Sequence, residues 1–230
     1  MKKYQNYLGG TLAILIASTM ANASFISYDT PAGSSVGAGP VNAQATFTTA
    51  AGSITILLQD LQVNPTNVGQ LVSDLSFTLS TGENSGTLGH NGGTNRTVAG
   101  DGSFTDGLLV LTGWALSTDG GGLELSVIGT PAAPTHLIIG PPDGSNLYSN
   151  ADTTIAGNGS NNPFLGESAS FFLAVPGVTA DSIVVSATFS FGTTAGVDVP
   201  GVQGSEVPEP AALSVLAMGG LVLFRRRRTA

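Results

Sequence analysis

Polar and apolar residues alternate along several short stretches of this chain, and this period of two determines the class of fold. The clearest stretch sets one apolar face, Ile183, Val185, Ala187, Phe189 and Phe191, against one polar face, Ser182, Ser186, Thr188 and Ser190. The same pattern recurs at Leu75, Phe77 and Leu79, at Leu123, Leu125 and Val127, and at Ala43, Ala45 and Phe47. Such alternation is typical of β-strands that bury one face.

Other stretches are more uniformly apolar and predict central strands that are buried on both faces. They are residues 54–61, 108–111, 136–139 and 170–175. Turn dipeptides such as Asp101-Gly102, Asp106-Gly107 and Asp143-Gly144 separate the strands. No stretch between the two chain ends has a sustained helical period. We therefore expect an all-β domain over residues 24–195, an antiparallel β-sandwich of jelly-roll type, with a barrel as the alternative.

The N-terminal residues have the pattern of a secretory signal peptide. Lys2 and Lys3 precede an apolar run over residues 8–20, and Ala21-Asn22-Ala23 supplies small residues at the positions that a signal peptidase reads. This pattern predicts a helical signal peptide over residues 1–23, with cleavage between Ala23 and Ser24. An uncleaved N-terminal anchor is the alternative.

The C-terminal residues form a three-part tail. Pro208-Glu209-Pro210 comes first, an apolar run follows over residues 211–224, and Arg225, Arg226, Arg227 and Arg228 come next. As a helix the run would reach about 21 Å, which is short for a bilayer core of about 30 Å. The arginines would stay on the cytoplasmic side. We expect a short transmembrane helix there, and an ordinary stop-transfer anchor is the alternative to a processing signal.

This tail resembles the PEP-CTERM sorting signal of Gram-negative bacteria. Pro208, Glu209 and Pro210 match its motif, residues 211–224 its span, and Arg225 to Arg228 its basic cluster. The resemblance covers residues 207–230 and implies recognition by an exosortase, a membrane-embedded processing enzyme. It also implies transient insertion in the inner membrane, removal of the tail, and delivery to the cell surface or the extracellular matrix. Residues 196–206 would form the linker before this signal.

Charge limits the partners that the exported part can have. One base, Arg96, against fifteen acids gives residues 24–209 a formal charge of −14, compared with −8 for the whole chain. Nucleic acid is excluded as a partner, because phosphate binding needs lysine and arginine. The chain has no cysteine, which excludes disulfides and thiol chemistry.

Several residues could carry chemistry, but none has a specific spacing. His90 and His136 lack neighbouring ligands for zinc, and no Gly-x-Ser-x-Gly motif is present. Calcium could bind oxygen donors in residues 101–107 or 143–152, although turns explain the same residues. Sugars could stack on an exposed ring, and a glycosidase would need two carboxyl groups at a suitable separation. The candidates for those two roles are Trp114, Tyr28 and Tyr148, and Glu124 with Glu167.

Together these features predict a non-enzymatic surface or matrix protein with no assigned catalytic, cofactor-binding or metal-ligating residue. Its expected partners are signal peptidase, an exosortase and an exopolysaccharide of a biofilm. A secreted polysaccharide hydrolase and a calcium- or carbohydrate-binding module are the alternatives.

Overall fold

The computed structural model describes residues 24–129, 135–149, 153–156 and 161–204, and this part of the chain is almost entirely β. Its one helical element is a 3₁₀ turn, η1 (Val68–Gln70). The strands are β1 (Ser24–Asp29), β2 (Ser35–Val36), β3 (Gly39–Pro40), β4 (Ala43–Ala50), β5 (Ser53–Asp60), β6 (Val72–Leu79), β7 (Thr87–Val98), β8 (Phe104–Val110), β9 (Ala115–Asp119), β10 (Gly122–Ser126), β11 (Ile138–Ile139), β12 (Phe164–Gly166), β13 (Ser168–Ala174), β14 (Val184–Phe191), β15 (Asp198–Pro200) and β16 (Val202–Gln203). The prediction of an all-β chain is confirmed for these residues.

Hydrogen bonds join most strands into one 14-stranded mixed sheet. Its main path is β15-β14-β6-β11-β12-β7-β13-β5-β4-β1-β16, while β10 and β9 extend from β6, and β8 pairs with β7. The pair β11–β12 is parallel, and every other described strand pair is antiparallel. β2 and β3 form a separate two-stranded hairpin.

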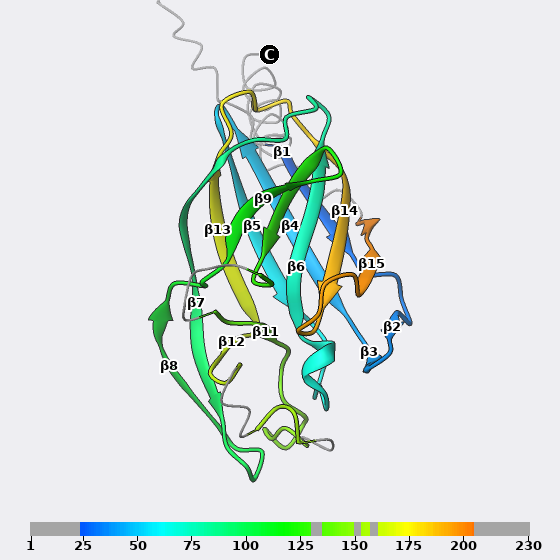
Figure 1. Ribbon diagram of the computed structural model, residues 1–230, viewed down its shortest axis with the longest axis vertical. Coiled ribbons are helices and arrows are strands. Elements are labelled where there is room, and N and C mark those ends of the chain that lie inside the picture. The colour runs from blue at the N-terminus through cyan, green and yellow to red at the C-terminus, as the bar shows by residue number, and fades with distance from the viewer. Residues whose placement is uncertain (1–23, 130–134, 150–152, 157–160, 205–230) are drawn as a thin grey trace, which may run out of the picture.

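The sheet folds back on itself, so that two of its parts face each other. Figure 1 shows β6, β9 and β14 in front of β1, β4 and β5. The long strand β7 connects the two parts: its first half pairs with β13, and its second half pairs with β12, which reaches β6 through β11. The second half of β7 also pairs with β8 on its other side. Core contacts join the two faces, because the rings of Phe47 on β4 and Phe77 on β6 lie 5.1 Å apart. The Tyr28 hydroxyl on β1 also donates to the Val184 carbonyl on β14 at 3.0 Å.

Strands with clean alternation bury the side chains that the sequence predicts. Leu75, Phe77 and Leu79 of β6 are buried, as are Leu123 and Leu125 of β10. The early strand with Ala43, Ala45 and Phe47 is β4, and all three side chains are buried as well. Alternation with a period of two therefore predicts the buried face correctly wherever a strand is regular.

The last long strand, β14, departs from its predicted pattern. Ile183 and Val185 are exposed, whereas Val184, Ala187, Phe189 and Phe191 are buried. The pairing with β6 shifts register between Val184 and Ser186, so Val185 is the extra residue of a bulge. A bulge reverses the alternation at that point, and this explains the error.

The uniformly apolar stretches were expected to be buried on both faces, and most are not. β5 and β13 alternate, with Leu57 and Phe172 partly exposed. Leu108 of β8 is 83% exposed, and Leu109 and Leu111 are similarly exposed, because β8 pairs only with β7. Residues 136–139, by contrast, are buried as predicted.

The two ends of the described domain lie side by side. β16 pairs with β1 through Tyr28–Gln203 and Asp29–Val202, and the Gly204 amide donates to the Ser27 carbonyl at 2.9 Å. β15 pairs with β14. The described residues of the predicted linker, 196–204, thus include two strands that pair with the domain.

Both predicted terminal helices lie outside the described residues, as do Ala21, Ala23, Pro208, Glu209, Pro210 and the arginines Arg225 to Arg228. Ser24, the predicted first residue after cleavage, begins β1. Within the described ranges, no helix has the length and apolar character needed to cross a membrane.

Candidate functional site

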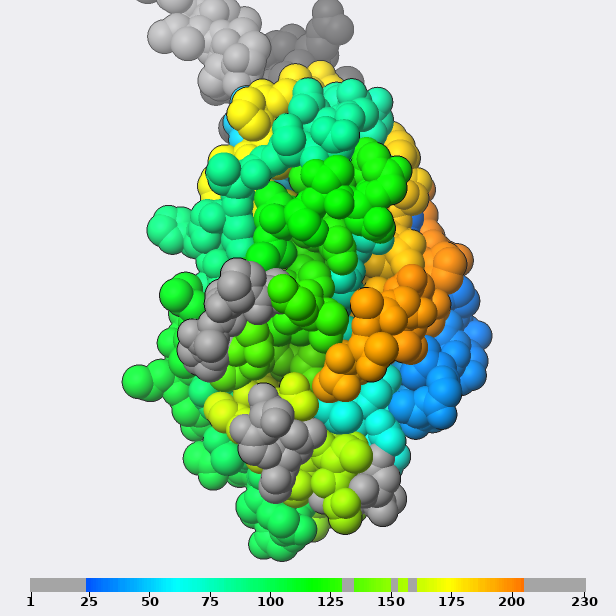
Figure 2. Space-filling model, viewed as in Figure 1, coloured from blue at the N-terminus to red at the C-terminus, as the bar shows by residue number. Residues whose placement is uncertain are grey.

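The strongest candidate site is a small acidic pocket between β10 and the turn that links β14 to β15. It has a volume of about 230 Å³. In Figure 2 it falls where the green surface of β9 and β10 meets the orange surface of β15. Its lining, defined here as the acidic pocket, is Ser73, Asp74, Ser76, Asp119, Glu124, Ser126, Ile128, Ser190, Thr194, Ala195, Gly196 and Asp198. Four carboxyl groups and several hydroxyl groups therefore share one hollow, and no basic side chain lines it.

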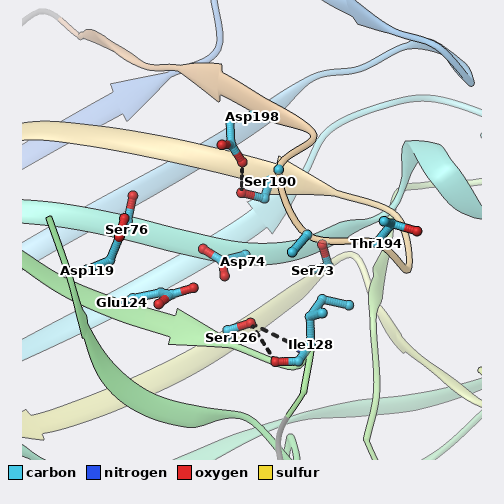
Figure 3. A pocket seen from close by; sticks show the side chains of 12 residues that line it. Ser73, Asp74, Ser76, Asp119, Glu124, Ser126, Ile128, Ser190, Thr194 and Asp198 are labelled. Carbon is cyan, nitrogen blue, oxygen red and sulfur yellow. Dashed lines mark hydrogen bonds between the residues drawn. The ribbon is translucent and has the colours of Figure 1, made fainter.

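Strand register assembles the centre of this pocket. Ser126 of β10 pairs with Asp74 of β6, Asp74 pairs with Ser190 of β14, and Ser190 pairs with Asp198 of β15. Side chains that are directly opposite on adjacent strands lie on the same face of a sheet. The four polar residues thus form one row across four strands, as Figure 3 shows from close by.

A second bulge, in β6, changes the direction of the first β6 residue that lines the pocket, Ser73. The pairing of β14 with β6 passes from Asp74 to Val72, which leaves Ser73 as the extra residue. Bulges turn a side chain away from its regular direction and often occur beside functional sites. Consecutive residues Ser73 and Asp74 consequently both line the pocket. The Ser73 side chain is fully buried, and its Oγ has no hydrogen-bond partner.

Asp74 is the most perturbed carboxyl group of the pocket. It is 8% exposed, and burial raises its pKa to about 8, with a further rise from its contact with Glu124 and from the nearby charge of Asp198. The hydroxyl of Ser126 opposes this shift. A carboxyl group in this setting keeps its proton near neutral pH, because burial disfavours its ionised form and the contact with Glu124 adds to that effect.

Two other carboxylates of the pocket, Asp198 and Glu124, accept hydrogen bonds from neighbouring hydroxyl groups. Ser190 Oγ donates to Asp198 Oδ1 at 2.5 Å, and Ser117 Oγ donates to Glu124 Oε2 at 2.8 Å. Ser126 Oγ accepts from the Ile128 amide at 3.0 Å. Hydroxyl groups orient these carboxylates but bring no positive charge, so the charge of the pocket stays uncompensated.

A second group of carboxylates surrounds Arg96 of β7 and is here called the Arg96 cluster: Arg96, Phe104, Asp106, Tyr148 and Glu167. The guanidinium donates to both Asp106 oxygens at 2.6 and 2.7 Å, and Nη1 donates to Glu167 Oε1 and the Tyr148 oxygen, both at 3.0 Å. It also lies 4.3 Å from the centre of the Phe104 ring. Burial acts to lower the pKa of Arg96, but the bonds from Asp106 and Tyr148 outweigh it and raise this pKa.

Local backbone geometry fits the chain around Arg96. A Cβ at Gly166 would lie 3.0 Å from Arg96 Nε, so the guanidinium packs closely against this glycine. Glu167 follows with a positive φ of 65°, which costs a non-glycine residue about 1–3 kcal/mol. Its amide donates to Ile139 and its carbonyl accepts from Asp60, so both neighbours fix the strained residue. The Nε, Nη1 and Nη2 groups of Arg96 and the Tyr148 hydroxyl therefore all donate to acceptors within the protein.

The structure separates most of the residues that were candidates for catalysis. Glu124 lies in the acidic pocket, whereas Glu167 binds Arg96, so the two do not form a glycosidase pair. His136 is buried, and its Nδ1 bonds with the Pro163 carbonyl. His90 lines a shallow, mostly apolar groove with Leu109 and Phe172.

The candidate sugar-stacking rings all lie inside the protein. Trp114 is buried against Phe171 and donates to the His136 carbonyl at 2.8 Å. Tyr28 and Tyr148 are buried too. None of the three can stack on a sugar ring at the surface, which excludes them as a carbohydrate-stacking site. The apolar strand pattern around Trp114 favoured core packing for this residue, and its burial confirms that.

In the two stretches considered for calcium, Asp101 and Asp143 accept hydrogen bonds within turns, and Asp106 binds Arg96. Residues 150–152 of the second stretch lie outside the described residues. Asp101 accepts from the amide and the hydroxyl of Ser103, and Asp143 accepts from the amides of Ser145 and Leu147. Gly102 is required in the first turn, because its φ is +85° and a Cβ would come within 2.1 Å of the Tyr148 carbonyl oxygen. In the described part of the chain, no group of three or more His, Asp or Glu side chains is arranged to hold a metal ion.

Sequence reasoning did not find Asp74, Ser73 or Asp198. Asp74 could have been found, because it shares the polar face of Ser76 and Thr78 one step before the predicted start of the strand. Asp198 falls within the predicted linker, and the bulge at Ser73 has no sequence signal.

The chain matches no protein-family model, and the searches of curated proteins and of solved structures gave no match either.

Proposed function

We propose that this chain is an exported surface or matrix protein that an exosortase-type system sorts and trims. The observation that carries the proposal is the ordered tail of Pro208-Glu209-Pro210, an apolar run over residues 211–224 and a cluster of arginines. The signal-peptide pattern at the other end supports it. The role that follows is structural or adhesive, in contact with an extracellular polysaccharide.

The arrangement of the domain ends is consistent with this route. Gly204 is hydrogen-bonded to Ser27, so a leader before Ser24 and a tail after Gly204 would leave the domain from neighbouring points. Three residues lie between Gly204 and Pro208, and an extended chain over those four steps reaches about 13 Å. A processing enzyme would therefore meet the motif close to the folded domain. The finer description of the fold that we propose is a β-sandwich of jelly-roll type, flanked by a signal helix and a short transmembrane helix.

A hydrolase is the less supported alternative. Glycosidases place two carboxyl groups about 5–9.5 Å apart, across space for a sugar or a water. Asp74 and Glu124 instead contact each other directly, and Glu167 is neutralised by Arg96. The acidic pocket favours a second role as a binding module, because it is open, charged and unpaired.

Mass spectrometry of the protein from a host with an exosortase-type system tests the proposal. We expect the recovered wild-type protein to begin at Ser24 and to lack Arg225 to Arg228. Glu209→Gln should retain the tail and accumulate in the inner membrane. Glu206→Gln is the matched control, since it removes a nearby carboxylate outside the motif. Normal trimming of Glu209→Gln, or a wild-type protein that keeps its arginines in the inner membrane, would contradict the proposal.

A further inference from the structure

We infer that the acidic pocket binds a primary ammonium group, carried either by an amino sugar or by an aliphatic amine. This inference concerns the β domain and does not depend on how the tail is processed. Asp74, Glu124, Asp198 and the buried hydroxyl of Ser73 form the binding surface.

The chemistry of the lining selects a hydrogen-bond donor with positive charge. The side chains offer carboxylate and hydroxyl oxygens, which accept hydrogen bonds. Arg96 is the only lysine or arginine among the described residues, and it is held in the Arg96 cluster. No protein cation is therefore present to balance the pocket, and a ligand can supply the missing charge.

The buried hydroxyl of Ser73 points independently to a ligand. A buried polar group without a partner costs about 1–3 kcal/mol, and native proteins contain few of them. The bulge in β6 places Ser73 on the pocket lining beside Asp74. Figure 3 shows β10 on one side of Asp74 and the β14–β15 turn on the other side. An ammonium group has three donors and no acceptor, so it can bond to Ser73 Oγ and to two carboxylates together.

Other ligand classes fit the pocket less well. Anions find no basic side chain in the lining and are repelled by its carboxylates, Glu124, Asp198 and Asp119. A neutral sugar would satisfy hydrogen bonds without balancing charge. A metal ion needs a convergent set of ligands, and no such group exists among the described residues. The volume of about 230 Å³ is roughly that of seven or eight waters, which suits one amine or one sugar ring but no longer chain.

Binding should release a proton. A cation stabilises the ionised form of Asp74, whose pKa is about 8 in the empty pocket. The titratable groups that face it are Glu124 of β10, Asp119 of β9 and Asp198 of β15. Affinity for an aliphatic amine should therefore rise between pH 6 and pH 9, where such an amine, like a lysine side chain, keeps its own charge.

Calorimetric titration of the full-length chain tests the inference, with methylamine and glucosamine as probes. We expect binding of both near neutral pH, with proton release seen as a buffer-dependent heat, and tightening of methylamine binding as pH rises. Binding of glucosamine alone would identify an amino sugar as the source, and binding of methylamine alone would identify an aliphatic amine. N-acetylglucosamine is the matched neutral probe and should bind at least tenfold more weakly than glucosamine.

Variants locate the site. Asp74→Asn and Ser73→Ala should each weaken binding of the probes about tenfold or more. Asp181→Asn, which removes an exposed carboxylate outside the pocket, should bind as the wild type does. Thermal melting of each variant checks its fold, and buffer-dependent heats on the wild type test the site without any variant. Failure of both amines to bind, equal binding of N-acetylglucosamine, or displacement of the amines by calcium chloride at lower concentration would overturn the inference.

Discussion

The Arg96 cluster and the acidic pocket both gather carboxyl groups at the sheet, yet they differ in one respect. In the first, a buried guanidinium, 5% exposed, binds Asp106 and Glu167, and the pKa of Asp106 is lowered by its bonds to Arg96. In the second, no cation is present, and burial raises the pKa of Asp74 to about 8. The same side-chain chemistry is thus internally satisfied at one place and left unsatisfied at the other. We interpret the first as structural and the second as available for a ligand.

Removing the Arg96 guanidinium should have the largest effect on stability. Arg96→Met is expected to lower the free energy of unfolding by about 3 kcal/mol, because it leaves Asp106, Glu167 and the buried Tyr148 hydroxyl without their shared donor. Urea denaturation at neutral pH measures this. Arg96→Lys keeps the charge but cannot bind both Asp106 oxygens at once, so it should lose less. Equal stability of Arg96→Met and wild type would show that the cluster contributes nothing.

The acidic pocket should make the protein less stable as pH rises. Between the unfolded pKa of Asp74, about 3.8, and its folded value of about 8, the folded chain holds a proton that the unfolded chain has released. Stability therefore falls over this window, and we expect a loss of about 2 kcal/mol from pH 6 to pH 8. Asp74→Asn should remove this part of the slope in a series of urea melts.

Asp60 has a raised pKa as well, because it is buried, and its contribution has the same sign. It is present in both proteins and cancels in the difference between wild type and Asp74→Asn. Parallel stability curves for these two proteins would refute the assignment of the slope to Asp74.

The smallest effect on the free energy of unfolding should come from Asp106, and its pH dependence has the opposite sign to that of Asp74. The folded pKa of Asp106 is lowered, so its stabilisation is present above the unfolded value of about 3.8 and is lost as pH falls through the folded value. The side chain is 41% exposed, and solvent screening limits the effect of Asp106→Asn to less than about 1 kcal/mol at pH 7. Asp181→Asn is the exposed control, and urea melts at pH 3 and pH 7 compare the two. A larger loss at pH 3 than at pH 7 would be inconsistent with this assignment.

Regular strands could be predicted from the sequence, and irregular ones could not. The faces of β4 and β10, and of β6 from Leu75 onward, follow from alternation alone, because a strand keeps its period of two where it has no bulge. The exposure of Ile183 and Val185 depends on a bulge that arises in the pairing with β6. The exposure of Leu108 depends on β8 lying at a sheet edge, which its own residues do not encode.

The acidic pocket was beyond the reach of sequence reasoning for a related reason. Its central row combines Ser126, Asp74, Ser190 and Asp198, which come from four strands and are brought together only by register. Arg96, by contrast, could be identified from the sequence as the one lysine or arginine of residues 24–209 and thus as the one permanent cation for ion pairs there. It does form the two described salt bridges.

The short strand β16 determines how the domain would respond to a force applied at Gly204. A pull on Gly204 would load two residue pairs with β1 one after the other, as in a zipper, because the strand ends there. β15 is also only three residues long and would detach next. Release of residues 198–204 would lengthen the tether by about 25 Å while β1, β4 and β14 stayed in the core. Such a segment would yield under load before the domain unfolds.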